Sequence, residues 1–431
     1  MSQAGFTPRV AIAVVVANMV GTGVFTSLGF QLLDISSHFA LMMLWLVGGV
    51  TALCGALTYA ELGARLPRSG GEYNFLSQIY HPALGFISGW ISVTVGFAAP
   101  IALAAMTFEA YLGGVLEVPI AGLPAVLLIL ALAILHGFSH RTSSDTQVSF
   151  TAIKLVVILA FCAAIFVFAD YQPVSLVPTA GDFPILLGGA FAVSLIYVNY
   201  AYTGWNAATY VLDELPDPGR VLPRVLVTGT LVVMGLYLLL NFSFLLAAPM
   251  DAMRGEIEIG VIAATAVFGE TGGRIMGGLL ALLLVSTVSA MVLAGPRVLA
   301  VVGQDFRAFS LLSRTNADGV PFVAIAVVAG LAVTFVLTST FESILVFSGF
   351  ALAANTLLAV AGVFVLRARD GAVETGYHIP AFPLPPLVYL GITLWTLGYI
   401  LTTRPAEGLA ALGMIASGGV LYLVTSRFSR S

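Results

Sequence analysis

The sequence has little charge. Only 9% of its 431 residues are Asp, Glu, Lys or Arg, whereas about a quarter are charged in a typical soluble domain. The 17 basic and 21 acidic residues leave a formal net charge of −4, so there is no basic footprint for nucleic acid. Hydrophobic residues make up 59% of the chain. This composition excludes an ordinary water-soluble globule and a nucleic-acid-binding protein.

Cysteine is also scarce. Cys54 and Cys162 both lie in long apolar runs, which excludes an outer disulfide framework and a cysteine metal cluster. His136 and His140 have the spacing of a ligand pair, but no third ligand is near, so we expect interfacial histidines and no metal site. No nucleotide-binding loop and no nucleophile paired with a base is recognisable. We therefore expect no cofactor, no enzymatic activity and no ATP-driven pump.

The few charges are spaced so that long segments carry none. Eleven charge-free runs occur, at 10–33, 35–60, 73–108, 118–140, 183–212, 225–250, 275–296, 319–341, 343–366, 375–403 and 408–426. A twelfth apolar stretch, 148–169, carries only Lys154. A membrane helix needs about 20 apolar residues, and lipid offers no partner for an unpaired backbone group. The runs therefore predict an all-α membrane protein with twelve transmembrane helices.

One further apolar segment is too short to span. Residues 259–269 lie between acidic residues and predict an interfacial helix in an external loop.

The basic residues predict the orientation. With the N-terminus in the cytoplasm, thirteen arginines fall in inner loops or termini, three in outer loops, and Lys154 inside the bilayer. The inner set is Arg9, Arg65, Arg68, Arg141, Arg220, Arg224, Arg297, Arg307, Arg314, Arg367, Arg369, Arg427 and Arg430, and the outer set is Arg254, Arg274 and Arg404. We expect both termini to be cytoplasmic and, because the first apolar run is long enough to span, no cleaved signal peptide.

Two of the expected helices contain helix-breaking clusters. In the first span, Gly21 and Gly23 flank Thr22 about halfway across the membrane. Such a sequence can unwind and present backbone N–H groups to an anion such as a carboxylate. Close helix packing by small residues is the alternative explanation.

The sixth span has a similar cluster around Gly204. Asn199, Thr203 and Asn206 place polar side chains in the middle of a long uncharged run, where unpaired polar groups are costly. Interhelical hydrogen bonding is the alternative explanation. Spans one and six begin two successive groups of five spans that cross the membrane in opposite senses. Interrupted helices at matching positions of two inverted halves indicate a secondary transporter.

Several segments, in order along the chain, resemble the amino acid–polyamine–organocation superfamily, and its L-type amino acid transporter branch in particular. They are Val20-Gly21-Thr22-Gly23-Val24-Phe25, Tyr59-Ala60-Glu61-Leu62-Gly63, Ser69-Gly70-Gly71-Glu72-Tyr73, Tyr200-Ala201-Tyr202-Thr203-Gly204-Trp205-Asn206, Asp213-Glu214-Leu215-Pro216-Asp217-Pro218 and Gly295-Pro296-Arg297. The resemblance implies a single transmembrane domain, 1–431, that moves amino acids by alternating access. It further implies inverted repeats at 9–170 and 183–366, with two extra helices at 382–426.

The resemblance also implies a binding site for a zwitterion. The carboxylate would bind at the unwound segment of Gly21, Thr22 and Gly23. The ammonium would bind carbonyls of Met19, Val20, Tyr200, Ala201 and Thr203. Tyr200 replaces the phenylalanine that is usual in the family at the aromatic lid, so the preferred side chain stays open. Asn206 is a further candidate, for which a packing role is equally consistent.

Lys154 is the only basic residue well inside a span. A charge there is costly and needs a partner in the bundle, unless its long stem reaches the interface. The resemblance favours a partner, because many members carry a lysine in span five that contacts the unwound first helix near span eight. We therefore expect Lys154 to replace the sodium ion of sodium-coupled relatives.

The leading interpretation is a sodium-independent exchanger of neutral L-amino acids in the cell (inner) membrane. The alternatives are a cationic amino acid or polyamine antiporter and a proton-coupled symporter with Lys154 or Glu109 as carrier. A channel or nutrient sensor fits less well. Eukaryotic relatives attach a heavy chain through a cysteine in the loop that corresponds to 113–122, which has none here, so we expect no covalent heavy-chain partner.

Overall fold

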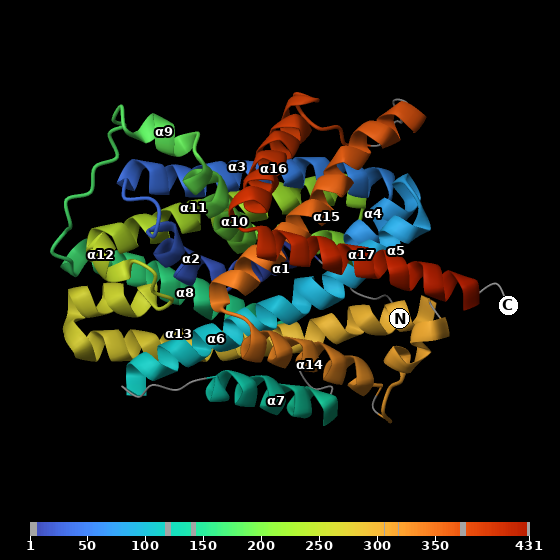
Figure 1. The fold of residues 1–431 in the computed structure, drawn as a ribbon, viewed down its shortest axis with the longest axis horizontal. Helices are drawn as coiled ribbons and strands as arrows, with labels where there is room; N and C mark the ends of the chain where they lie inside the picture. Colours follow the sequence, from blue (N-terminus) through green and yellow to red (C-terminus); the bar gives the residue numbers. More distant parts are fainter. Residues whose placement is uncertain are drawn as a thin grey trace.

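The computed structural model describes residues 7–116, 122–138, 144–305, 307–317, 319–370 and 376–428, and every regular element in these ranges is helical (Figure 1). The first half contains α1 (Pro8–Met19), α2 (Gly23–Gln31), α3 (His38–Arg65), α4 (Gly71–Ile79), α5 (Pro82–Ile91), a π-helical segment (Ser92–Phe97), α6 (Ala98–Leu116), α7 (Leu123–Phe138) and α8 (Ser144–Phe168). The second half contains α9 (Asp182–Leu186), α10 (Gly189–Tyr202), a 3-10 helix (Ala207–Glu214), α11 (Pro218–Ala247), α12 (Met250–Met253), α13 (Ile259–Asp305), a 3-10 helix (Arg307–Ser313), α14 (Phe322–Thr338), α15 (Phe341–Asp370), α16 (Leu384–Thr403) and α17 (Pro405–Phe428).

Eight helical stretches in the described ranges are long and apolar enough to cross a bilayer. They are Pro8–Gln31, His38–Arg65, Pro82–Leu116, Pro218–Ala247, Ile259–Ala300, Phe341–Asp370, Leu384–Thr403 and Pro405–Thr425, and three shorter apolar helices are Leu123–Gly137, Ala152–Phe168 and Phe322–Thr338. Large apolar side chains are exposed on the outer helices, for example Leu127 at 55% and Val156 at 64%. Apolar groups can remain uncovered on this scale where lipid, and not water, surrounds them. The helices agree with the predicted all-α membrane class, while the number of twelve spans stays a prediction.

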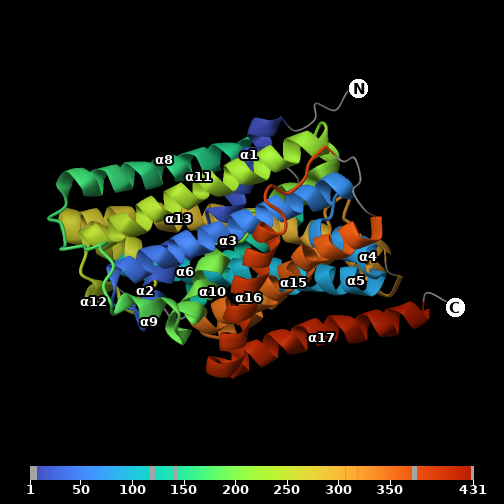
Figure 2. The ribbon, with the colours of Figure 1, turned by 90° about the horizontal axis from the view of Figure 1, so that it is seen from above.

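Most of the long helices run along the long axis of the molecule, whereas α16 crosses it steeply, and α10 lies in the middle of the bundle (Figure 2). α3 packs along α11, and α6 packs along α13. α1 lies against α11, and α2 lies against α10. Figure 2 shows α8 and α17 at opposite edges of the bundle. The chain therefore surrounds the α1–α2 and α10 segments with long helices.

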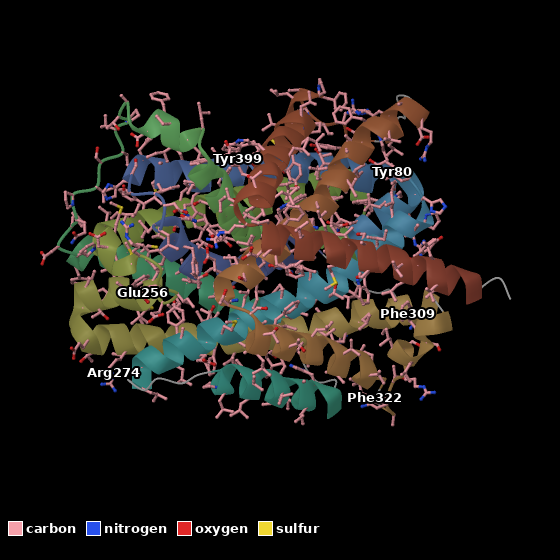
Figure 3. All side chains as sticks on the ribbon, in the orientation of Figure 1. Tyr80, Glu256, Arg274, Phe309, Phe322 and Tyr399 are labelled. Atoms are coloured by element: carbon pink, nitrogen blue, oxygen red, sulfur yellow. The ribbon has the colours of Figure 1, made fainter. Side chains whose placement is uncertain are left out.

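Loops expected on different sides of the membrane lie at opposite ends of the bundle. Figure 3 shows Glu256 and Arg274, from the expected outer region, toward one end. Tyr80, Phe309 and Phe322, at or beside expected inner loops, lie toward the other. These loops therefore separate as the alternation of spans requires.

Two element boundaries differ from the charge-free runs. The run 73–108 is divided, because α4 ends at Ile79 and α5 begins at Pro82. Proline has no N–H and favours the first turn of a helix, and the His81 side chain caps this one by accepting from the Ala83 N–H at 3.1 Å. The span thus begins after the short helix α4.

The second difference concerns segment 259–269. It is the first arm of α13, which turns back at Gly269, where φ is +70°. The arms pack closely, since a Cβ at Gly260 would lie 2.6 Å from a Leu280 methyl carbon. The segment is therefore one arm of a helical hairpin.

The loop that contains Thr179 is hydrogen-bonded, through Asp182 at its end, to the residue before α3. The Asp182 carboxylate accepts from the Ser37 hydroxyl, from the Thr179 N–H at 2.6 Å and from the Thr179 hydroxyl at 2.8 Å. The hydrogen bond from Ser37, followed by those from Thr179, lowers the pKa of Asp182 below its usual value.

Candidate substrate site

The helical backbone is interrupted after α1. α1 ends at Met19, Val20 has a non-helical ψ of 80°, and α2 begins at Gly23. In the described part of the chain, the N–H groups of Thr22, Gly23 and Val24 have no hydrogen-bond acceptor. Unpaired N–H groups and the positive end of the helix dipole together suit an anion.

Glycine is required where the two interrupted segments touch. A Cβ at Gly23 would lie 2.7 Å from the Cα and 2.8 Å from the Cβ of Ala201. Real Cβ contacts are essentially never this short, so only glycine allows α2 to begin directly against α10.

The second interruption follows α10. This helix ends at Tyr202, Thr203 turns to ψ 138°, and Gly204 adopts φ +108°. That φ favours glycine, and a Cβ at Gly204 would also lie 2.8 Å from the backbone of Asn18. The chain then continues as the 3-10 helix Ala207–Glu214. Each interruption thus packs against the other interrupted helix.

A cavity of about 350 Å³ lies at the two interruptions. Its walls also include residues of the π-helical segment, α6, α13, α15 and α16. Val14 and Asn18 of α1 line the cavity. Every residue of α2 is buried, and no residue of α2 after Gly23 lines the cavity. The cavity therefore extends toward the end of the bundle where α1 begins.

The structure brings the predicted site residues together, with one difference. Met19, Gly21, Thr22, Gly23, Tyr200, Ala201, Thr203 and Asn206 line the cavity. Val20 is fully buried beside it and is not among the lining residues. The Tyr200 hydroxyl has no hydrogen-bond partner within the described ranges, so it is a free polar group at the cavity wall.

Tyr237 joins the two interruptions and was missed from the sequence. Its hydroxyl lies 2.5 Å from the carbonyl oxygen of Met19 and 2.9 Å from that of Ala201. One hydroxyl hydrogen serves both acceptors. The Met19 carbonyl also accepts from the Gly21 N–H at 2.8 Å, whereas in the described part of the chain the Ala201 carbonyl accepts from Tyr237 alone and keeps a free lone pair. A lone tyrosine in an apolar span gave no sequence signal for this role.

Lys154 of α8 reaches into the bundle, and its residue exposure is only 8%. Its ammonium donates to the Val20 carbonyl oxygen at 3.2 Å and to the Thr287 hydroxyl of α13 at 3.0 Å. The lysine does not extend to the interface. It connects three elements, α8, the end of α1 and α13.

Glu72 was also missed, although its motif was noted. This carboxylate is 2% exposed and is the one acidic side chain among the described residues that line the cavity. It accepts from the hydroxyls of Tyr59 at 3.0 Å and Tyr210 at 2.8 Å and from the Asn206 amide. The sequence signal is the glycine pair before it, since Gly70 and Gly71 have φ of +119° and +53°.

Two other ionisable candidates lie away from the cavity. Glu109 accepts from the N–H groups of Gly122 and Ala125, at 2.6 and 3.1 Å, and so caps the start of α7. His136 is 4% exposed, and its Nε2 lies 2.7 Å from the Ser289 hydroxyl. It is therefore buried against α13 in place of the expected interfacial position, and His140 lies outside the described residues.

A helical membrane protein in which two interrupted helices meet at a central cavity has the architecture of a secondary transporter. The chain matches the family described as amino acid permease over residues 6–424. It therefore belongs to the amino acid permease family, and it is a multi-pass membrane transporter and not an enzyme.

Curated relatives cover nearly the whole chain. The serine/threonine exchanger SteT of Bacillus subtilis is 28% identical over 426 residues, which is 97% of this chain and 96% of the relative. The b(0,+)-type amino acid transporter 1 of Mus musculus is 24% identical over 428 residues, 96% of this chain and 86% of the relative. The large neutral amino acids transporter small subunit 2 of Rattus norvegicus is 26% identical over 444 residues, 96% and 79% respectively.

Proposed function

We propose that the protein is a sodium-independent exchanger of neutral L-amino acids that works by alternating access. The name of one relative supports amino acid exchange, and the name of another supports transport of neutral amino acids. In this proposal the chain has twelve spans, with inverted repeats at 9–170 and 183–366 and two further spans at 382–426. Spans one and six are the interrupted ones, which agrees with the ends of α1 at Met19 and α10 at Tyr202.

The amino acid would lie between the two interruptions. Its carboxylate would accept from the free N–H groups at Thr22 and Gly23, next to Gly21. Its ammonium would donate to nearby carbonyls, for which a half-helix C-terminus is suited. The candidate carbonyls are those of Met19, Val20, Tyr200, Ala201 and Thr203. Thr203 is the best placed of them, because its carbonyl accepts no other hydrogen bond in the described part of the chain.

The observation that carries the sodium-independent proposal is the pair of hydrogen bonds made by Lys154. A fixed ammonium bonded to a carbonyl of the unwound segment and a hydroxyl of α13 supplies the charge that a bound cation would otherwise supply. Because the ammonium is covalently attached, no sodium ion has to enter with the substrate. The contacts therefore support Lys154 as a substitute for sodium.

The arginine distribution supports cytoplasmic termini in the cell membrane. With that orientation, the cavity extends toward the cytoplasm. The absence of cysteine from residues 113–122 favours function without a covalently attached heavy chain.

Glu72 favours a second candidate, a cationic amino acid or polyamine antiporter. A carboxylate in the cavity wall could pair with a basic side chain. Its three hydrogen-bond donors already occupy most of its acceptor positions, which favours neutral substrates as the first candidate.

A competition panel tests both candidates. The purified protein in proteoliposomes would take up one labelled amino acid while each of the common amino acids and polyamines competes, with sodium and pH varied. Competition by neutral amino acids without sodium dependence is expected. Competition by arginine and polyamines alone would favour the second candidate, and no competition by any amino acid would contradict both.

A further inference from the structure

We propose that Glu72 is a specificity-determining residue that acts through Asn206, by turning the carbonyl oxygen of that amide toward the cavity. The cavity wall then selects amino acids whose side chains carry a hydrogen-bond donor, such as a hydroxyl. This inference rests on the proposed transport of amino acids through the same cavity.

The backbone before α4 positions Glu72 for this role. Gly70 and Gly71 both have positive φ, which glycine adopts without strain. A Cβ at Gly71 would lie 2.6 Å from a ring carbon of Tyr210, so the glycine also admits this ring. Glu72 then falls in the first turn of α4, where the helix dipole favours a carboxylate.

The hydrogen bonds around Asn206 fix the orientation of its amide. Nδ2 donates to Glu72 Oε1 and, at 3.3 Å, to the hydroxyl oxygen of Tyr210. The Tyr210 hydroxyl cannot point its own hydrogen at Asn206, because it donates to Glu72 Oε2 at 2.8 Å. An ionised carboxylate only accepts hydrogen bonds, so it holds the NH₂ group of the amide on its side.

Both amide hydrogens of Asn206 are therefore used within the protein, and its Oδ1 is not. In the described ranges this oxygen accepts no hydrogen bond. It is also not one of the fully buried side-chain atoms without a partner, so it is accessible from the cavity. Asn206 lines the cavity, so Oδ1 is the group that a substrate would meet. A hydroxyl can donate to it, whereas a methyl group in the same place leaves it without a partner.

Two isosteric pairs of substrates test whether Glu72 and Asn206 select for a side-chain hydroxyl. Threonine and valine differ by a hydroxyl in place of a methyl group, as do serine and 2-aminobutyrate. We expect wild-type protein in proteoliposomes to prefer the hydroxyl member by kcat/KM. In Glu72→Gln, an amide replaces the carboxylate and can donate to Asn206, which releases its orientation. The threonine-to-valine ratio of kcat/KM should fall about 2- to 12-fold, the range of one neutral hydrogen bond.

Tyr59→Phe is the matched control. It removes one donor to Glu72 but leaves both hydrogen bonds of the Asn206 amide in place. Its threonine-to-valine ratio should equal that of the wild type, even if its Tm falls. If Glu72→Gln does not fold, Tyr210→Phe replaces it, since this variant removes one of the two acceptors of the amide and should lower the ratio in the same direction.

An unchanged ratio in the folded Glu72→Gln or Tyr210→Phe protein would overturn the inference, as would wild-type protein with no hydroxyl preference. In either case exchange itself persists, and the proposed function stands. Wild-type protein that exchanges no amino acid would overturn the proposed function and this inference with it.

Discussion

Replacing Lys154 by methionine removes the ammonium and keeps most of the side-chain volume. The Val20 carbonyl loses its only donor in the described part of the chain, in a residue that is fully buried. Thr287 is less affected, because its hydroxyl still reaches the carbonyl oxygen of Leu283 at 3.2 Å. The main consequence is therefore an unpaired acceptor at the end of α1.

The size of the effect follows from that acceptor. A buried carbonyl left without a partner costs about 1–3 kcal/mol, which corresponds to roughly a 5- to 160-fold change in an equilibrium or rate. The hydrogen bond that connects the end of α1 to Lys154 of α8, and through it to α13, would be lost. We therefore expect the exchange rate to decrease by a factor in that range. Thr287→Val removes only one of the two partners of the ammonium and should reduce the rate less.

The assay is exchange of labelled against unlabelled amino acid in proteoliposomes, with Tm measured on the same preparations. A slower Lys154→Met protein that remains folded is the expected result. Wild-type exchange rates in both Lys154→Met and Lys154→Ala would refute the assigned role.

Three further outcomes follow from the geometry. Gly23→Ala should reduce uptake about 5- to 160-fold in folded protein, because the new Cβ would lie 2.7 Å from the Cα of Ala201 and overpacking of this kind costs roughly 1–3 kcal/mol; uptake near wild type would contradict the close contact. Tyr237→Phe should lower kcat/KM about 5- to 160-fold, since the Ala201 carbonyl loses its donor and the Met19 carbonyl keeps only the Gly21 N–H, and an unchanged kcat/KM would exclude this bridge. The pKa of Asp182 is lower in the folded state than in the unfolded state. Its hydrogen bonds therefore contribute stability above the unfolded pKa of about 4, and this contribution is lost as the pH falls through the folded pKa. Tm between about pH 5 and 2 should therefore fall less steeply in Asp182→Asn than in wild type, and equal slopes would contradict the lowered pKa of Asp182.

The sequence was sufficient to predict the class of fold because the bilayer imposes a simple constraint. Spacing of the charged residues located the apolar helices, although it merged α4 with the span that begins at Pro82. A charge-free run contains no information about a turn between two helices. Only the proline and the His81 cap give that boundary.

The glycine clusters located the cavity, since Gly23 and Gly204 occupy positions where a Cβ would clash with the other interrupted helix. The sequence could not identify Tyr237, because nothing in an apolar helix distinguishes a tyrosine that joins two distant carbonyls from one that packs. Glu72 was missed for a different reason: it precedes the third span, and its approach to Asn206 depends on how α4 folds back. Long-range contacts of this kind are not encoded in local spacing.

The central claim is that amino acids exchange through this cavity without sodium because Lys154 supplies the charge. A counterflow assay tests this claim most directly. Proteoliposomes loaded with unlabelled amino acid are diluted into medium that contains labelled amino acid and either sodium or choline. The account predicts transient accumulation of label at equal rates in both media. Accumulation that requires sodium, or none in either medium, would contradict it.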